Sequence, residues 1–225
     1  MFKILQMYRS LGFFFMCFIV TLASKAEVGV SVGARAGFNI AHLRKFTPPD
    51  GYKKRVNLGS DIAAVLRVDF NKYIGLQTEL NFTQKGQGWK RSEDSAKYNA
   101  KFVANYIQFP VLAVARVGNE KVKGVFFLGP YFAYWTGGYT QNSVSIDKQS
   151  KNATTQKYVF TNKDMRFDVG LTTGAGANFK VGKGWIEVAA RHNLGMMSTT
   201  KKNSGLTKTF NCNFNLSVGY LYTIK

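Results

Sequence analysis

Few side chains in this 225-residue sequence have the types and spacing that catalysis requires. The two histidines, His42 and His192, cannot by themselves complete a metal site with three protein ligands. His42 opens a long polar segment, where a loop Ser or Asp could join it in the site of a surface lipid acyltransferase, but nothing fixes a nucleophile beside it. No phosphate-binding loop, nucleophile elbow, zinc-protease helix or paired-cysteine motif is present. We therefore predict a protein that is not an enzyme and has no catalytic residues, cofactor or metal.

A second group of reactive side chains consists of carboxylates and arginines that alternate with apolar residues. Asp168 and Glu187 fall on polar faces and could work as an acid–base pair. Arginines share those faces, and all five cations there are Arg although Lys supplies most of the positive charge, so ion pairing in a sealed interior is the better interpretation. The predicted buried charge network contains five residues of each sign: Arg35, Asp61, Arg67, Asp69, Glu79, Arg116, Arg166, Asp168, Glu187 and Arg191.

The elements that position these side chains are predicted to be β-strands. Apolar and polar residues alternate with period two, which is typical of a strand with one apolar and one polar face. In the segment 58–70, for example, Ile62 and Leu66 share one face while Asp61 and Arg67 share the other. The eight such segments lie near 28–40, 58–70, 74–86, 102–117, 124–137, 164–179, 184–197 and 209–224. Segment 124–137 is apolar on both faces, so its orientation cannot be read.

Alternation alone does not decide which face points inward. A soluble lipocalin-type barrel would bury the apolar face, whereas a membrane barrel would turn it toward lipid. The polar faces are rich in Gly, Ser, Asn and Thr and carry balanced charge, which suits the crowded interior of eight strands. We therefore predict an all-β fold, an eight-stranded antiparallel up-and-down transmembrane β-barrel. On the last strand Cys212 and Phe214 should face lipid; Trp89 and Trp135 should join the interfacial girdles, with carbohydrate stacking as the alternative for Trp89.

The connections between these segments alternate between short and long. Long polar segments near 41–57, 87–101, 138–163 and 198–208 would then emerge at one end, with both termini at the other. The long segments hold sixteen Lys and Arg against four Asp and Glu. We expect this basic loop surface to meet lipopolysaccharide; its predicted residues are Arg44, Lys45, Lys53, Lys54, Arg55, Lys90, Arg91, Lys201 and Lys202.

The N-terminal residues indicate export. Lys3 and Arg9 precede an uncharged apolar run, residues 11–22, and Ser24-Lys25-Ala26 supplies a cleavage site. We predict a signal peptide over 1–26 and a barrel domain over 27–225; an uncleaved anchor is the alternative. The chain has 31 Lys and Arg against 12 Asp and Glu, and the segment 1–26 holds three of the basic residues, which leaves a net charge of +16. That charge predicts an anionic partner, and export disfavours nucleic acid.

Several strand motifs resemble a known family. GARAGFN (33–39), YIQFP (106–110), FLGPYFAYW (127–135) and FDVGLTTGAGANF (167–179) are similar to the outer-membrane β-barrel domain of Bacteroidetes-type bacteria, the porin-family or PorT-like proteins. The resemblance covers the mature chain and implies an eight-stranded barrel in the outer membrane of a Gram-negative cell. A few relatives serve in type IX protein secretion.

These observations together predict a monomeric outer-membrane protein with a plugged lumen. It would act in envelope structure or surface recognition, with outer-membrane lipid and lipopolysaccharide as partners. The alternatives are a PorT-like component of a secretion or assembly system with an envelope protein partner, small-solute transport, and the surface lipid acyltransferase.

Overall fold

The computed structural model describes residues 28–93, 96–146, 150–201, 205 and 207–224. The predicted signal peptide lies outside these residues, as does Lys202. The described strands are β1 (Gly29–Arg44), β2 (Lys53–Arg55), β3 (Asn57–Asp69), β4 (Ile74–Ser92), β5 (Ala96–Gly118), β6 (Val122–Ile146), β7 (Ser150–Lys157), β8 (Phe167–Val181), β9 (Gly184–Ser198) and β10 (Phe210–Thr223). Within the described residues, no helix has the length and apolar character needed to cross a membrane.

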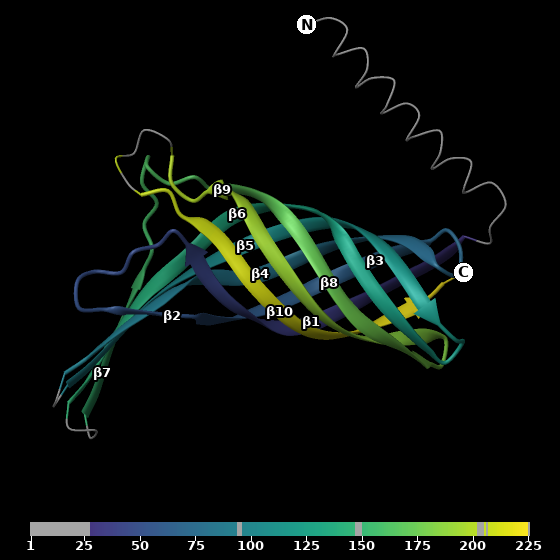
Figure 1. Cartoon of the computed structure of the whole chain (residues 1–225), viewed down its shortest axis with the longest axis horizontal. Coiled ribbons are helices and arrows are strands. Elements are labelled where there is room, and N and C mark those ends of the chain that lie inside the picture. The colour runs from purple at the N-terminus through teal and green to yellow at the C-terminus, as the bar shows by residue number, and fades with distance from the viewer. Residues whose placement is uncertain (1–27, 94–95, 147–149, 202–204, 206, 225) are drawn as a thin grey trace, which may run out of the picture.

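Eight of the strands form one closed antiparallel ring (Figure 1). Their order around the ring is β1-β3-β4-β5-β6-β8-β9-β10. The last strand pairs back onto the first, from Ser31 opposite Thr223 to Arg44 opposite Phe210. Closure leaves the ring without a free strand edge. The predicted eight-stranded up-and-down β-barrel is confirmed.

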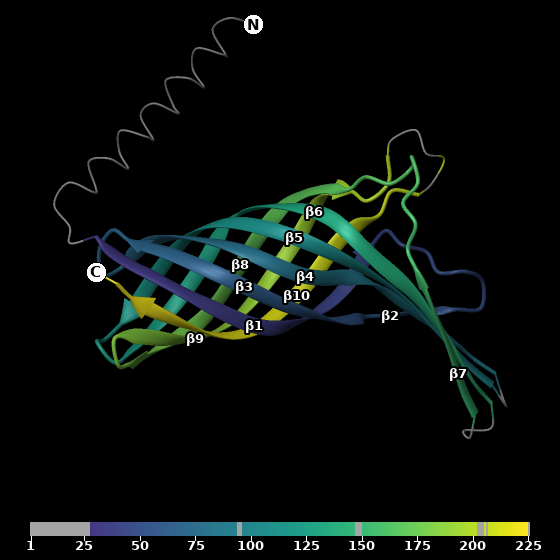
Figure 2. The same cartoon turned by 180° about the vertical axis from the view of Figure 1, so that it is seen from behind.

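Short turns join the strands at one end of the barrel. In the β3–β4 turn, Asn71 Oδ1 accepts hydrogen bonds from the backbone N–H groups of Tyr73 and Ile74, both at 2.8 Å. Asn119 does the same in the β5–β6 turn, and its side chain thereby stabilises the chain reversal. Strand β1 begins and strand β10 ends at this end, opposite the long connections (Figures 1 and 2). The predicted placement of the short turns at one end, with the long segments at the other, is therefore confirmed.

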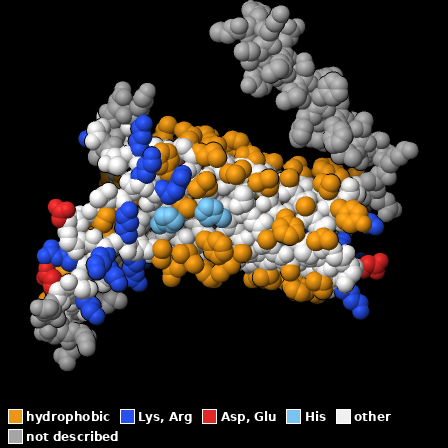
Figure 3. All heavy atoms as spheres, viewed as in Figure 1, with side chains coloured by type: hydrophobic (Ala, Val, Ile, Leu, Met, Phe, Trp, Pro, Cys, Tyr) orange, Lys and Arg blue, Asp and Glu red, His pale blue; other side chains and the backbone are white. Residues whose placement is uncertain are grey.

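The apolar faces of the strands point outward. Ile62 is 57% exposed on the outer surface, whereas its neighbour Asp61 is 3% exposed in the lumen. Apolar side chains cover the middle of the barrel as a band, shown in orange in Figure 3. Because a soluble protein would leave so large an apolar surface in water, the band indicates a lipid-facing wall. The predicted orientation of the two faces is confirmed.

Small residues on the inner face make room for larger side chains. A Cβ atom built on Gly170 would lie 2.5 Å from the ring of Tyr131, and one built on Gly174 would lie 2.7 Å from Cγ of Arg191. Glycine at these two positions allows a tyrosine and an arginine to fill the lumen. This explains why the polar faces are rich in glycine.

The structure also orients the segment that the sequence left open. In β6, the odd-numbered residues from Val125 to Trp135, among them Phe127 and Tyr131, are buried on the inner face, and the even-numbered residues between them face outward. Trp135 was predicted in an interfacial girdle; that prediction is wrong, because its ring is 2% exposed inside the barrel and packs against Tyr106.

Two of the expected long loops are largely strand. The outer parts of β4 (87–92), β5 (96–101) and β6 (138–146) run beyond the ring as one sheet, with β2 added at the β4 edge and β7 at the β6 edge. We call this extension the flap; Figures 1 and 2 show it leaving the barrel at the long-loop end. Sequence alternation missed it because both faces of the flap are largely polar, so its strands lack an apolar side.

Candidate functional site

The lumen holds a connected network of arginines and carboxylates. Arg35 contacts Glu79 through Nε at 2.9 Å and Nη2 at 2.8 Å, and it also pairs with Asp61. Arg191 binds Glu79 at 2.6 Å and Glu187 at 2.9 Å. Arg67 completes the chain by pairing with Glu187. We call these six residues the lumen network: Arg35, Asp61, Arg67, Glu79, Glu187 and Arg191.

The lumen network crosses the barrel from wall to wall. Glu79 lies on β4 and Arg191 on β9, and these two strands stand on opposite sides of the eight-stranded ring. Glu79 is 2% exposed and Arg191 is also 2% exposed, so the pair is sealed from solvent. Because an unpaired charge in such a setting would be costly, each carboxylate of the lumen network is held by one or two arginines.

The remaining predicted network residues occupy three other places. Asp69 and Arg116 form a separate ion pair of 2.8 Å near the short turns. Asp168 lies toward the long loops and accepts hydrogen bonds from Tyr131 at 3.2 Å and Asn211 at 2.9 Å. The prediction for Arg166 is wrong. It precedes β8, donates to the backbone oxygen of Trp135 at 3.0 Å and has no Asp or Glu partner among the described residues.

A buried lysine accompanies Asp168, contrary to the expectation that only arginines enter the lumen. Lys85 Nζ lies 3.4 Å from Asp168 Oδ2 and 4.4 Å from the ring centroid of Tyr131. The signal was present in the sequence, because position 85 continues the polar face that Gln77 and Glu79 begin. Most lysines of the chain lie in the long segments, and Lys85 differs from them because Asp168 is its buried partner.

This arrangement favours a structural role for the lumen charges. Asp168 and Glu187, considered above as an acid–base pair, bind different partners: Lys85 for the first, Arg67 and Arg191 for the second. In the part of the chain that the structure describes, no cluster of three His, Cys, Asp or Glu could hold a metal ion.

His42, His192 and Cys212 lie close together on the outside of the barrel. Cys212 pairs with His42 across β1 and β10, and its Sγ is 3.3 Å from Nε2 of His192. Figure 3 shows the histidines at the long-loop edge of the apolar band. Cys212 was predicted to face lipid, but its side chain is only 5% exposed. The register of β10 against β9 shifts between Phe210 and Cys212, and the thiol lies against the His192 ring.

The predicted basic residues divide among three places at the long-loop end. Lys53, Lys54 and Arg55 form β2, which pairs with Lys90, Trp89 and Gly88 of β4 on the flap. Arg91 is also on the flap and pairs with Glu93.

The others lie at the barrel mouth or in the last long loop. Arg44 and Lys45 flank the ring of Phe210, at 5.4 and 5.5 Å from its centroid. Lys201 is exposed in the loop that follows β9.

The flap presents these cations in rows on one face. Residues opposite one another on neighbouring strands point to the same side of a sheet. Arg55, Gly88, Lys101 and Gln141 therefore form one row, and a second row contains Lys53, Lys90, Asn99 and Ser143. Lys101 was not among the predicted surface residues, although it lies in the same basic segment.

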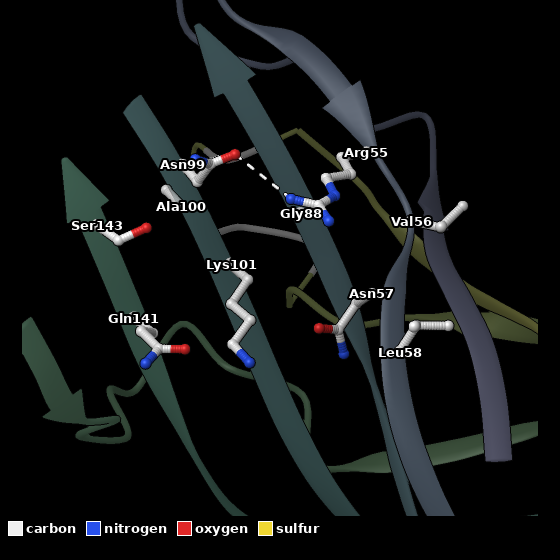
Figure 4. A pocket seen from close by; sticks show the side chains of 10 residues that line it. All are labelled: Arg55, Val56, Asn57, Leu58, Gly88, Asn99, Ala100, Lys101, Gln141 and Ser143. Atoms are coloured by element: carbon white, nitrogen blue, oxygen red, sulfur yellow. Dashed lines mark hydrogen bonds between the residues drawn. The ribbon is translucent and has the colours of Figure 1, made fainter. Parts of the chain in front are cut away.

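A groove of about 310 Å³ runs along this face of the flap (Figure 4). Arg55 and Lys101 project into it, and Arg55 donates a hydrogen bond of 3.3 Å to Asn99. Val56 and Leu58 line the same groove and are 49% and 67% exposed. Leu58 also belongs to the outward face of β3, so the groove begins where the lipid-facing band ends. Among the described residues that line it, none is acidic.

The comparisons with known proteins agree with this architecture. A family model described as outer membrane protein beta-barrel domain matches residues 23–201. The chain belongs to this family of outer-membrane β-barrel proteins. Membership in the family places it in the bacterial outer membrane, as the sequence predicted. No curated protein sequence matches the chain.

Several solved outer-membrane barrels match the chain at low identity. Ail of Yersinia pestis, solved with the heparin analogue sucrose octasulfate, is 17% identical; the match covers 87% of this chain and 99% of Ail, with a TM-score of 0.38. Neisserial surface protein A is 15% identical over 86% of this chain and 96% of its own, with a TM-score of 0.42. OprG of Pseudomonas aeruginosa is 12% identical over 89% and 98%, with a TM-score of 0.42.

Proposed function

We propose that this barrel is a non-enzymatic surface protein that binds the phosphate groups of lipopolysaccharide through the groove on the flap. One observation carries the proposal: Arg55 and Lys101 project into a groove that Val56 and Leu58 also line, at the edge of the lipid-facing band. Lipopolysaccharide has apolar and charged groups in the matching order, with acyl chains in the membrane and phosphates directly above them. The two cations would meet the phosphates while Val56 and Leu58 contact the chains.

The energetics of such a site follow from its charge and position. A Lys or Arg near an anionic membrane surface contributes about 1 kcal/mol to binding. Lys53 and Lys90 stand in the row next to Arg55 and Lys101, so four cations face one side. Screening would weaken their attraction as salt rises, since the Debye length is about 8 Å at physiological ionic strength.

The closed lumen supports a surface role in place of solute transport. The ion pair between Glu79 and Arg191 spans the barrel, and the bulky side chains of Arg67, Tyr106 and Tyr131 are fully buried inside it. Eight strands leave an interior that such side chains fill. A solute would therefore have to break several buried ion pairs to pass.

Charge neutralisation on the flap tests the proposal. In a quadruple variant, Lys53→Gln, Arg55→Gln, Lys90→Gln and Lys101→Gln remove the cations of the two rows. A matched control removes four exposed lysines from the short-turn end: Lys72→Gln, Lys121→Gln, Lys180→Gln and Lys183→Gln. Both variants lose four positive charges, so any difference in their affinity for lipopolysaccharide reports where on the barrel the charges lie.

Each purified barrel is reconstituted in phospholipid nanodiscs, and its affinity for lipopolysaccharide is measured at low salt. We expect the flap variant to bind at least about tenfold more weakly, because up to four contributions of about 1 kcal/mol are removed. The control variant should bind like the unmodified protein. Equal affinities for the flap variant and its control would reject the proposal.

The resemblance to PorT-like proteins gives a competing proposal, a component of a secretion or assembly system. Deletion of the gene distinguishes the two: unchanged protein secretion would remove the competing role.

A further inference from the structure

The barrel has a second hollow, inside its long-loop mouth. A cavity of about 440 Å³ lies between the long loops and the lumen; we call it the cup. One wall is aromatic and is formed by Trp89, Phe102 and Trp135 from β4, β5 and β6. The ring of Tyr158 lies 4.9 Å from that of Trp135 and 5.1 Å from that of Phe102. These contacts hold the rings of Phe102 and Trp135 in place, and Phe46 packs against Trp89 at 5.6 Å.

The wall across the cup carries hydroxyl and amide groups. Thr199 directly follows β9, Thr209 directly precedes β10 and Asn211 lies at the start of β10; these two strands face β4 and β5 across the ring. The hydroxyls of Thr199 and Thr209 are 2.6 Å apart. Asn211 donates hydrogen bonds to Tyr106 at 3.1 Å and to Asp168 at 2.9 Å, which fixes its side chain. The cup therefore has a flat apolar side opposite a side of neutral hydrogen-bonding groups.

The charge of the cup differs from that of the rest of this basic protein. Among the described residues that line it, Asp164 is the single charged one. Its oxygens accept hydrogen bonds from the Tyr158 hydroxyl at 2.9 Å and from the Thr161 backbone N–H at 2.6 Å. Burial and the hydrogen bond to Asp164 raise the pKa of Tyr158 to about 12, so its hydroxyl stays protonated. An anionic ligand would find no cationic side chain on these walls. A cationic ligand would find only Asp164, whose oxygens already accept hydrogen bonds from Tyr158 and Thr161.

We propose that the cup binds one or two uncharged sugar units of a glycan. A hexose ring has an apolar face of C–H groups and an edge of hydroxyls, which match the aromatic wall and the threonine wall. The volume lies within the range of small-ligand sites, and a rigid aromatic surface reduces the entropy lost on binding.

The cup is independent of the groove proposed to bind phosphate. Gly88 and Lys101 lie on one face of the flap, whereas Trp89 and Phe102 lie on the other.

Tryptophan fluorescence gives a direct test, since the chain has three tryptophans and two of them line the cup. Full-length protein in detergent micelles is first screened against an array of neutral hexose and N-acetylhexosamine oligosaccharides. Oligosaccharides that bind are then titrated while emission is recorded in a Trp185→Phe background, because Trp185 lies at the short-turn end. We expect saturable binding with a change in emission.

Two variants locate the binding. Trp89→Ala removes a partly exposed ring of the aromatic wall, and Thr200→Val removes one hydroxyl with little change in shape. We expect about tenfold weaker binding for Trp89→Ala, the equivalent of one stacking contact, and unchanged binding for Trp185→Phe. Heat-modifiable electrophoretic mobility confirms that each variant is folded.

Three results would overturn the proposal: no binding to any neutral oligosaccharide, unchanged affinity in both cup variants, or binding of quaternary ammonium compounds alone. Competition by polysaccharide cleaved from lipopolysaccharide supports a cell-surface glycan as the source. Competition by free oligosaccharides alone supports a soluble one.

Discussion

Replacement of Glu79 by Gln probes the charge network that fills the lumen. The carboxylate accepts from Arg35 at 2.8 and 2.9 Å, from Arg191 at 2.6 Å and from Gln77 at 2.5 Å. Glu79→Gln removes the charge and keeps the shape. Two guanidinium groups are then left in a sealed lumen with one carboxylate fewer, although Asp61 still holds Arg35 and Glu187 still holds Arg191.

The expected loss in the free energy of unfolding follows from those contacts. Removing one partner of a buried ion pair costs about 3–5 kcal/mol, and the surviving partners place this variant near the lower end, at about 3 kcal/mol. The same substitution at Glu93 is the control, because the Arg91–Glu93 pair is 44% exposed at both side chains and should contribute about 0.2–1 kcal/mol.

Urea unfolding of each protein in phospholipid vesicles measures the difference. We expect the midpoint of Glu79→Gln to fall by about 1 M or more and that of Glu93→Gln to stay nearly unchanged. A loss below about 1 kcal/mol for Glu79→Gln would refute the reasoning, because a buried carboxylate that holds two arginines should contribute more than a surface pair.

Three further results are expected. Planar-bilayer recordings of the purified protein should show no stable conductance, because the Glu79–Arg191 pair spans the lumen; a steady open level would contradict this. Cys212 should react slowly with both membrane-soluble and polar maleimides, and His192→Ala should speed the membrane-soluble reagent; fast labelling of the unmodified thiol would show that it is uncovered. Difference absorbance against Tyr158→Phe should show tyrosinate forming near pH 12, so the stability from this hydroxyl is complete below pH 10 and lost as pH rises through 12. Asp164→Asn should move this transition toward pH 10. A transition at pH 10 in the unmodified protein would contradict the partly buried, hydrogen-bonded hydroxyl.

Alternation within the strands predicted the barrel, and the composition and charge balance of the polar faces predicted its orientation. Period two places Asp61 and Arg67 on the face opposite Ile62, and the near balance of cations and acids on the polar faces favoured a sealed lumen, although Arg166 lies outside it and Lys85 inside. The flap could not be found in this way. Both of its faces are largely polar, so the pairing of Arg55 with Gly88 and of Lys101 with Gln141 leaves no hydrophobic period in the sequence.

The lumen network was predicted as a set, but its pairing was not. Each partner lies on another strand, and the pairing of Glu79 with Arg191 joins residues 112 positions apart. The aromatic cup was missed for a related reason. The segment that contains Trp135 is apolar on both faces, so only the register with β5 and β8 shows which side points inward.

The affinity of the unmodified protein for phosphorylated and dephosphorylated lipid A tests the proposed function most directly. Both lipids are presented to the barrel in nanodiscs, at low and at high salt. The groove of Arg55 and Lys101 predicts at least about tenfold tighter binding of the phosphorylated lipid at low salt, with the difference shrinking as salt rises. Equal affinity for the two lipids at low salt would contradict the assignment of the groove to lipopolysaccharide phosphates.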